Sequence, residues 1–223
     1  MANTYRKGII LAGGTGSRLY PITNSISKQL LPIFDKPMIY YPISTLMLAG
    51  IKDILIITNP EHLSLFKKLL GNGNQWGINL IYKTQEKPNG IAEAYLLADK
   101  FLDGYPSVLI LGDNIFFGNA LRDKLLSADN KLEGATVFLY RVKDPKPFGV
   151  AHFDENQKII NIEEKPKNPK SNFIITGLYY FDENAQRYSK DLNFSKRNEL
   201  EIVDLLNIYI KKELVSFETL GRG

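Results

Sequence analysis

The sequence GIILAGGTGSRLYP, residues 8–21, joins a short apolar run to a glycine-rich loop near the start of the chain. Residues 8–11 predict a buried strand, because apolar residues without polar alternation suit a strand covered on both faces. The glycines that follow allow close approach of a ligand, and exposed N–H groups at such a turn can bind phosphate. We therefore predict an α/β phosphate-binding fold. A tight turn without a ligand is the alternative for this segment taken alone.

Two familiar phosphate-binding motifs are incomplete in this loop. A Walker A loop ends in Gly-Lys-Ser/Thr, whereas Arg18 follows the glycines here and no such lysine is present. A dinucleotide fingerprint needs a third glycine after Gly14 and Gly16, and Leu19 occupies that position. The loop therefore disfavours a dehydrogenase as well as a Walker-type nucleotidase.

Apolar runs alternate with amphipathic segments along the rest of the N-terminal half, as in βα units. The pattern predicts helices at residues 38–49, 59–70 and 92–101, and strands at residues 54–57, 80–82 and 108–111. The second half is richer in strand-like runs with short connections. These runs are residues 136–141, 149–153, 159–163 and 173–181, followed by a predicted helix at 201–212. We predict one domain over residues 1–223, with a nucleotide-binding half (about 1–115) and a mixed-sheet, sugar-binding half (about 116–223).

The amino-acid composition limits which class of protein this is and which kinds of metal or catalytic site it can contain. The 223 residues are 44% hydrophobic and 23% charged, as in ordinary globular proteins, with no membrane-length apolar run. The first ten residues have no signal-peptide pattern, so we expect a cytoplasmic protein without a membrane partner. The absence of cysteine excludes disulfides, zinc thiolate sites and cysteine nucleophiles, and with two histidines a metal would bind carboxylates, which favours Mg²⁺. The net charge of +4 without a dense basic stripe argues against nucleic acid.

Several charged residues stand where phosphate chemistry would need them. Arg18 and Lys28 follow the glycine-rich loop, and two cations beside exposed amides suit a triphosphate, although each alone could be a solvated surface group. Asp113 follows the predicted strand at 108–111, at the edge where parallel sheets present ligand-binding groups. Its alternative role is to cap the next turn. Glu164 and Lys165 are either ligand groups or part of a solvated hairpin.

Longer motifs continue from the loop to the end of the chain. They are LAGG-T-G-SRL-YP, SKQLLPIFDKPMIYYPISTLMLAGI, LLGNGNQWGI, Gln85 with Pro88-Asn89-Gly90, LILGDNIFFG, EEKP, PKSNF, TGLYYFD, RNELEIVDLLNIY and GRG. In length and order they resemble the motifs of the bacterial glucose-1-phosphate thymidylyltransferase family, over essentially the whole chain. Uridylyl-transferring relatives usually carry a different segment in place of SKQLLP.

This resemblance implies a Rossmann-like nucleotidyltransferase fold, with a mixed, mainly parallel central sheet flanked by helices. It implies that the phosphate of glucose 1-phosphate attacks the α-phosphorus of dTTP, releasing pyrophosphate and forming dTDP-glucose, with Mg²⁺ as cofactor. Positioning and charge stabilisation supply most of the catalysis of such a step. The family commonly forms tetramers, so a homo-oligomer is expected. Its product commonly feeds dTDP-rhamnose and other deoxysugar pathways.

The resemblance also implies roles for individual residues. Catalysis is assigned to Arg18, Lys28, Asp113 and Lys165, and Asp113 is also the expected Mg²⁺ ligand. The nucleotide-binding residues are expected to be Leu11, Gly13, Gly14, Gly16, Gln29, Gln85, Pro88 and Gly90. The sugar-phosphate residues are expected to be Gly149, Glu164, Lys165, Thr176, Gly177 and Tyr179. For Gln85 and Gly90, an ordinary polar loop after a strand is the alternative.

The chain departs from the family pattern at several positions. Ser17 stands in place of the usual threonine, Phe148 in place of tyrosine, and Glu93 where glutamine is common. Family members continue past the GRG at residues 221–223 into a segment that carries a second Mg²⁺ ligand. We therefore expect weak metal binding through Asp113 alone and reduced turnover from these 223 residues. The alternatives are transfer of a uridylyl or other nucleotide group, or a nucleotide-binding domain with impaired catalysis.

Overall fold

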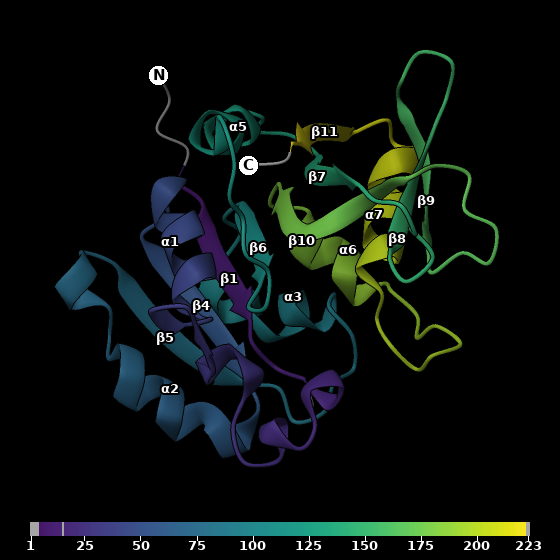
Figure 1. Ribbon diagram of the computed structural model, residues 1–223. Helices are drawn as coiled ribbons and strands as arrows, with labels where there is room; N and C mark the ends of the chain where they lie inside the picture. The colour runs from purple at the N-terminus through teal and green to yellow at the C-terminus, as the bar shows by residue number, and fades with distance from the viewer. Residues whose placement is uncertain (1–4, 15, 222–223) are drawn as a thin grey trace.

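The computed structural model describes residues 5–14 and 16–221, and in these residues nine strands form one sheet (Figure 1). Neighbouring strands follow the order β11-β7-β10-β6-β1-β4-β5. Outside this order, β8 pairs with β10 on one side and with β9 on the other. The strands are β1 (Lys7–Leu11), β4 (Asp53–Thr58), β5 (Asn79–Thr84), β6 (Ser107–Leu111), β7 (Ala135–Arg141), β8 (Gly149–Phe153), β9 (Ile159–Glu164), β10 (Phe173–Phe181) and β11 (Val215–Leu220). A separate short hairpin pairs β2 (Pro32–Ile33) with β3 (Lys36–Pro37).

The direction of the strands divides the sheet into two parts. β1 runs parallel to β4 and β6, and β4 runs parallel to β5. β10 is antiparallel to β6, β7 and β8, whereas β11 is parallel to β7. The structure therefore confirms a mixed sheet with a parallel nucleotidyltransferase-type core in the N-terminal half.

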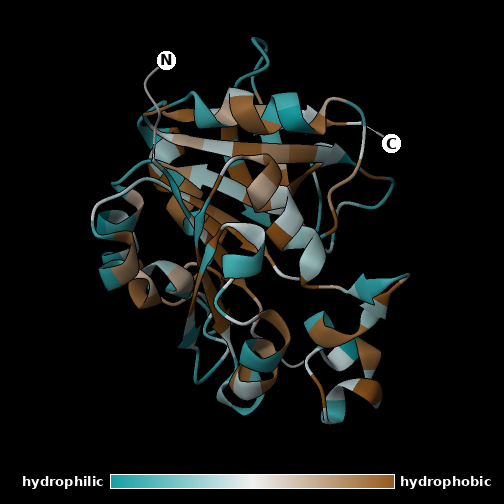
Figure 2. Cartoon of the chain, turned by 90° about the vertical axis from the view of Figure 1, so that its left-hand side faces the viewer, coloured by the Kyte–Doolittle hydropathy of each residue, from teal (hydrophilic) through white to brown (hydrophobic). Residues whose placement is uncertain are grey.

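Helices cover both faces of this sheet, which explains the unbroken apolar strands (Figure 1). Ile9 belongs to a core cluster with residues of α3 and α7, whereas Ile10 belongs to a second cluster with residues of α1 and α2. Successive side chains of a strand point to opposite faces, so a strand buried on both faces must be apolar throughout. In Figure 2 the central strands are largely hydrophobic, and the helices around them carry both kinds of residue. The helices are α1 (Tyr40–Leu48), α2 (Leu63–Leu70), α3 (Glu93–Leu97), α4 (Asp99–Leu102), α5 (Leu121–Asp129), α6 (Ala185–Lys190) and α7 (Ile202–Lys211).

Some boundaries differ from the sequence-based prediction. The predicted helix at 92–101 is wrong as a single element, because Ala98 separates α3 from α4. The predicted helix at 59–70 begins with a 3-10 turn, Pro60–His62, before α2. The helices α5 and α6 and the strand β11 were not predicted from the sequence pattern. The helix α6 has only six residues, α5 is rich in charged and polar side chains, and β11 depends on pairing with β7, a partner about 80 residues earlier in the chain.

Candidate nucleotide and sugar-phosphate site

The carboxyl ends of β1 and β6 bring the glycine-rich loop and Asp113 together. Leu11 and Leu111 are register partners, and the Gly112 N–H donates to the Leu11 carbonyl at 2.9 Å. Both connections therefore leave the sheet at the same edge. This is the edge at which open α/β sheets bind ligands.

The glycine-rich loop is held in place by Asn59, which follows β4. Its Nδ2 donates to the Gly14 carbonyl, and its Oδ1 accepts from the Gly14 N–H, both at 3.2 Å. Gly14 has a φ of 107°, which favours glycine. A Cβ on Gly13 would lie 2.9 Å from the side-chain oxygen Oε1 of Gln85, and one on Gly16 would lie 2.8 Å from Thr23. A side chain at position 13 or 16 would therefore have to displace Gln85 or Thr23.

Lys28 and Asp113 form an ion pair between two hollows in the surface. Asp113 Oδ2 accepts from the Lys28 ammonium, and Oδ1 accepts from Asn114 Nδ2 at 2.9 Å. Both side chains of the ion pair are partly exposed, with 25% and 34% of their surface accessible. The two residues are 85 positions apart in the chain, so only the fold brings them together.

The larger hollow, of about 1090 Å³, is lined by all six residues expected to bind sugar phosphate. Its lining includes Arg18, Leu111, Asp113, Pro147, Phe148, Gly149, Glu164, Lys165, Thr176, Gly177 and Tyr179. The smaller hollow, of about 480 Å³, is lined by residues that include Gly14, Lys28, Asn59 and Pro88. The other residues expected to bind the nucleotide line neither of these two hollows; they are Leu11, Gly13, Gly16, Gln29, Gln85 and Gly90. The expected sugar-phosphate residues thus share one hollow, whereas only Gly14 and Pro88 of the expected nucleotide-binding residues line the other.

Gln29 lies behind the surface of the site rather than in it. It is 1% exposed, and its Oε1 accepts from the Ser27 hydroxyl at 2.5 Å. A Cβ on Gly112 would lie 3.1 Å from Gln29 Cγ, so the side chain packs against the turn that precedes Asp113. In this conformation Gln29 supports the loop that carries Asp113.

A bulge in β10 shapes the wall of the larger hollow. The register with β7 shifts between Ile175 and Tyr179, and Thr176 and Gly177 lie within that interval. The Gly177 N–H donates to Asn114 Oδ1 at 3.0 Å, which ties the bulge to the residue beside Asp113. The Thr176 hydroxyl donates to the Phe138 carbonyl at 2.9 Å. Bulges commonly redirect side chains beside functional sites.

Tyr179 lines the same hollow. The side chain is 3% exposed, and burial raises the pKa of its hydroxyl, with the Glu164 and Asp113 carboxylates adding to the effect. The hydroxyl therefore stays protonated and can act as a neutral hydrogen-bond donor. Gly149 leaves room nearby, since a Cβ there would lie 2.8 Å from Ile175 and 3.4 Å from Glu164 Oε2.

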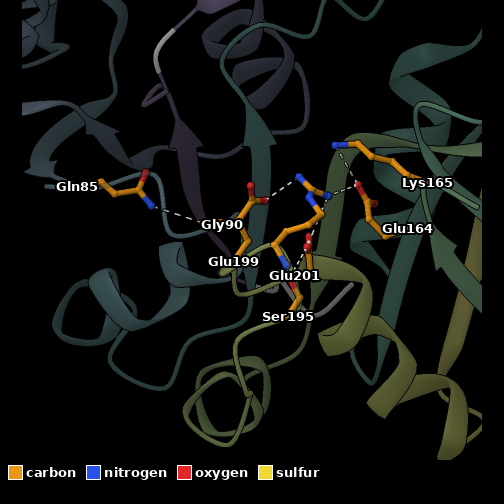
Figure 3. A network of polar contacts seen from close by, with 8 residues as sticks. Gln85, Gly90, Glu164, Lys165, Ser195, Glu199 and Glu201 are labelled. Atoms are coloured by element: carbon orange, nitrogen blue, oxygen red, sulfur yellow. Dashed lines mark hydrogen bonds and ion pairs between the residues drawn. The ribbon is translucent and has the colours of Figure 1, made fainter.

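Arg197 pairs with three carboxylates beside the larger hollow, and the sequence patterns did not single it out; Figure 3 shows its partners Glu164, Glu199 and Glu201. Its guanidinium lies 3.1 Å from Glu164 Oε1, 3.0 Å from Glu199 Oε2 and 3.5 Å from Glu201 Oε1. Lys165 Nζ lies 3.7 Å from the same Glu164 oxygen. The signal was available in the motif RNELEIVDLLNIY, where one arginine precedes two glutamates.

Burial and the charges of this network together shift the pKa values of Arg197 and Glu201. Partial burial lowers the pKa of Arg197, but the Glu201, Glu199 and Glu164 carboxylates outweigh burial and raise it above its ordinary value. Burial raises the pKa of Glu201. Two neighbours lower it in part: the Ser195 hydroxyl, which donates to Glu201 at 2.9 Å, and the positive charge of Arg197. Arg197 thus carries a permanent positive charge that holds Glu164 in place.

Asp113 is the expected Mg²⁺ ligand, and its surroundings fit a metal site in which substrate phosphates supply further ligands. In the part of the chain that the structure describes, no group of three or more His, Cys, Asp or Glu side chains could hold a metal. Mg²⁺ is commonly bound through one or two carboxylates, waters and substrate phosphates. A single carboxylate in the larger hollow, paired with a lysine that lines the smaller one, suits that mode better than a site made by protein alone.

The family follows from comparison with known proteins. A sequence model described as nucleotidyl transferase matches residues 7–223. A glucose-1-phosphate thymidylyltransferase of Xanthomonas campestris pv. campestris is 56% identical over 99% of this chain and 75% of its own length. The chain belongs to the glucose-1-phosphate thymidylyltransferase family. A Neisseria gonorrhoeae member is 54% identical over 97% of this chain and 75% of its own length.

Solved structures of related enzymes have the same fold. A Bacillus anthracis protein described as a glucose-1-phosphate thymidylyltransferase, in complex with sucrose, matches 97% of this chain and 87% of its own, with a TM-score of 0.90 and 46% identity. A UDP-glucose pyrophosphorylase complexed with UDP-glucose matches 93% of this chain and 87% of its own, with a TM-score of 0.81 and 25% identity. Every helix within residues 5–14 and 16–221 of this nucleotidyltransferase is too short or too polar to cross a membrane.

Proposed function

We propose that this chain joins dTTP and glucose 1-phosphate to give dTDP-glucose and pyrophosphate. The observation that carries the proposal is the Lys28–Asp113 pair, which lies between a hollow at the glycine-rich loop and a hollow lined by Glu164 and Lys165. Substrates bound on the two sides would meet at this pair. Relatives at 54–56% identity carry the name of this reaction.

Different residues of the site have different roles in the proposed in-line displacement. The phosphate oxygen of glucose 1-phosphate forms a bond to the α-phosphorus of dTTP, and the bond from that phosphorus to the leaving pyrophosphate oxygen breaks. Arg18 and Lys28 offset the negative charge of the phosphates, and Lys165 holds the attacking phosphate. Fixed cations of this kind stabilise charge that develops in the transition state. Glu164 accepts hydrogen bonds from sugar hydroxyls, and Gln85 with the Gly90 backbone contacts the base.

Mg²⁺ is the proposed cofactor, with Asp113 as its contact in these residues. When bound, the ion would offset phosphate charge and make the α-phosphorus more electrophilic. Lys28 contacts the same carboxylate, so it can exchange between Asp113 and a nucleotide phosphate as substrate and metal arrive. A homo-oligomer stays a prediction from the resemblance, which sedimentation velocity can measure, and a cytoplasmic location stays a prediction from the sequence.

The test is pyrophosphate release in the presence of Mg²⁺ and glucose 1-phosphate, with dTTP compared with UTP. We expect faster release with dTTP. The likeness to UDP-glucose pyrophosphorylase favours UTP as the second candidate substrate, and preference for UTP would replace the thymidylyl proposal by a uridylyl one. Binding of dTTP by folded protein without release would leave a nucleotide-binding domain.

A further inference from the structure

Glu93 is the first residue of α3, and it closely follows the loop with Gln85 and Gly90 that is expected to contact the base. Its two carboxylate oxygens accept hydrogen bonds from two side-chain amides. Oε2 accepts from Gln85 Nε2 at 2.5 Å, and Oε1 accepts from Asn89 Nδ2 at 2.8 Å. Gln85 is 4% exposed, so its amide is almost entirely enclosed by protein. The orientation of this amide is therefore set by its neighbours rather than by water.

An ionised carboxylate accepts hydrogen bonds and cannot donate them. Glu93 consequently requires Gln85 to turn its NH₂ group toward α3. The same nitrogen also lies 3.4 Å from the Gly90 carbonyl, so both of its hydrogens are directed at acceptors. Gln85 Oε1 is left on the opposite side, facing the glycine-rich loop, where a Cβ on Gly13 would lie 2.9 Å from it. Gln85 thus offers the nucleotide an acceptor and no donor.

We propose that Glu93 is a positioning residue for base selection, which acts by fixing the Gln85 amide so that only its oxygen faces the nucleotide. This role rests on the proposed function, in which Gln85 contacts the base. Thymine and uracil carry a hydrogen on N3, which an acceptor can bind. Cytosine N3 is itself an acceptor at neutral pH, so it would face the Gln85 oxygen without a hydrogen between them. Leaving two acceptors opposed in a buried site is costly.

The loop itself does not depend on Glu93 for its backbone position. The Leu200 N–H donates to the Asn89 carbonyl at 2.6 Å, and the Ala92 N–H donates to the Leu200 carbonyl at 3.0 Å. Gly90 packs so closely on this segment that a Cβ there would lie 2.4 Å from the Leu200 carbonyl oxygen. Loss of the Glu93 carboxylate should therefore free the Gln85 amide while the loop keeps its place.

The experiment compares binding of dTTP and dCTP by isothermal titration calorimetry, without glucose 1-phosphate so that no turnover occurs. We expect wild-type protein to bind dTTP more tightly than dCTP, and E93L to reduce this ratio by about tenfold or more. E93Q provides the conservative rescue, because its side-chain oxygen can still accept from Gln85 Nε2, and it should keep most of the ratio. N89A is the matched control, since it removes the other hydrogen bond of Glu93 and should change the ratio less than threefold.

A double variant separates action through Gln85 from a general structural effect. Q85L should lose the dTTP preference, and E93L/Q85L should have the same ratio as Q85L alone. A preference that survives in folded E93L would overturn the role of Glu93 while leaving the proposed function in place. Wild-type protein without a preference for dTTP over dCTP would overturn both the role of Glu93 and the proposed base contact.

Discussion

The two sides of the site are built in different ways. On the nucleotide side, Gly13, Gly14 and Gly16 come from one short loop after β1, and Asn59 fixes that loop from the end of β4, while Arg18 just after the glycines lines the larger hollow. On the sugar side, the expected residues come from β8, β9 and the bulge of β10, and the loop before α7 adds Arg197. A loop after a parallel strand can form a phosphate site by itself, whereas the sugar site exists only when several strands are correctly paired.

The difference predicts that nucleotide binding and sugar binding can be damaged separately, except at the pair that joins them. D113N should lower kcat with dTTP by about a thousandfold or more, because it removes the charge that faces Lys28 and the expected metal ligand. Steady-state pyrophosphate release measures the effect. D123N, at an exposed position of α5, is the matched control and should leave kcat unchanged. A fall of less than tenfold in D113N would remove Asp113 from the catalytic centre.

Arg197 should affect the sugar side alone. R197M removes the cation that holds Glu164, so KM for glucose 1-phosphate should rise about tenfold, and KM for dTTP should change less than threefold. Initial rates with one substrate varied at a time give both constants. R187M, on the exposed surface of α6, is the control. Equal increases in both constants would show that the two sides are not separable at this residue.

The packing of the C-terminal half offers a smaller test, on stability. The Tyr209 hydroxyl of α7 donates to Asp182 Oδ1 at 2.5 Å, and Asp182 Oδ2 accepts from the Gly134 N–H at 2.9 Å. Y209F removes the hydroxyl donor from a buried carboxylate oxygen that still accepts from the Asn184 N–H at 2.9 Å, and the lost hydrogen bond should lower the free energy of unfolding by about 1–3 kcal/mol. Urea denaturation measures it. Unchanged stability would mean that water replaces the hydroxyl.

The smallest expected effect is on the pH dependence of folding stability, through His152 in the β8–β9 hairpin. Burial lowers the pKa of His152, Lys170 lowers it further, and Glu163, 3.8 Å from Nε2, raises it in part. The unfolded chain then takes up a proton first as pH falls below about 6.5, so His152 should favour unfolding increasingly from there toward lower pH. H152Q should weaken the loss of stability between pH 7 and pH 5 in urea denaturation. Identical pH slopes for wild type and H152Q would contradict this.

Much of the nucleotide side was predictable because it is local. The apolar run at residues 8–11 and the glycines after it predicted β1 and its loop, and the run at 108–111 predicted β6 with Asp113 at its end. The parallel order of these strands makes their carboxyl ends neighbours, so Asp113 and the loop could be expected to meet. Contact between Lys28 and Asp113 could not be derived from spacing, because 85 residues separate them.

The sugar side depends on information that no single segment contains. The β10 bulge that includes Gly177 appears only when β10 pairs with β7, and β11 forms a strand only beside β7. Arg197 was missed because its partner Glu164 lies 33 positions earlier, in another element.

The sequence by itself determined the alternation of strands and helices, the glycine-rich loop and the kinds of charge around it, since periodicity and backbone freedom are properties of neighbouring residues. The tertiary structure alone decided which of those charges meet. It placed Lys28 against Asp113, enclosed Gln85 beside Glu93 and gave Arg197 three carboxylates. Such contacts depend on strand order and register, which are set by the packing of the whole sheet rather than by any one stretch of the chain.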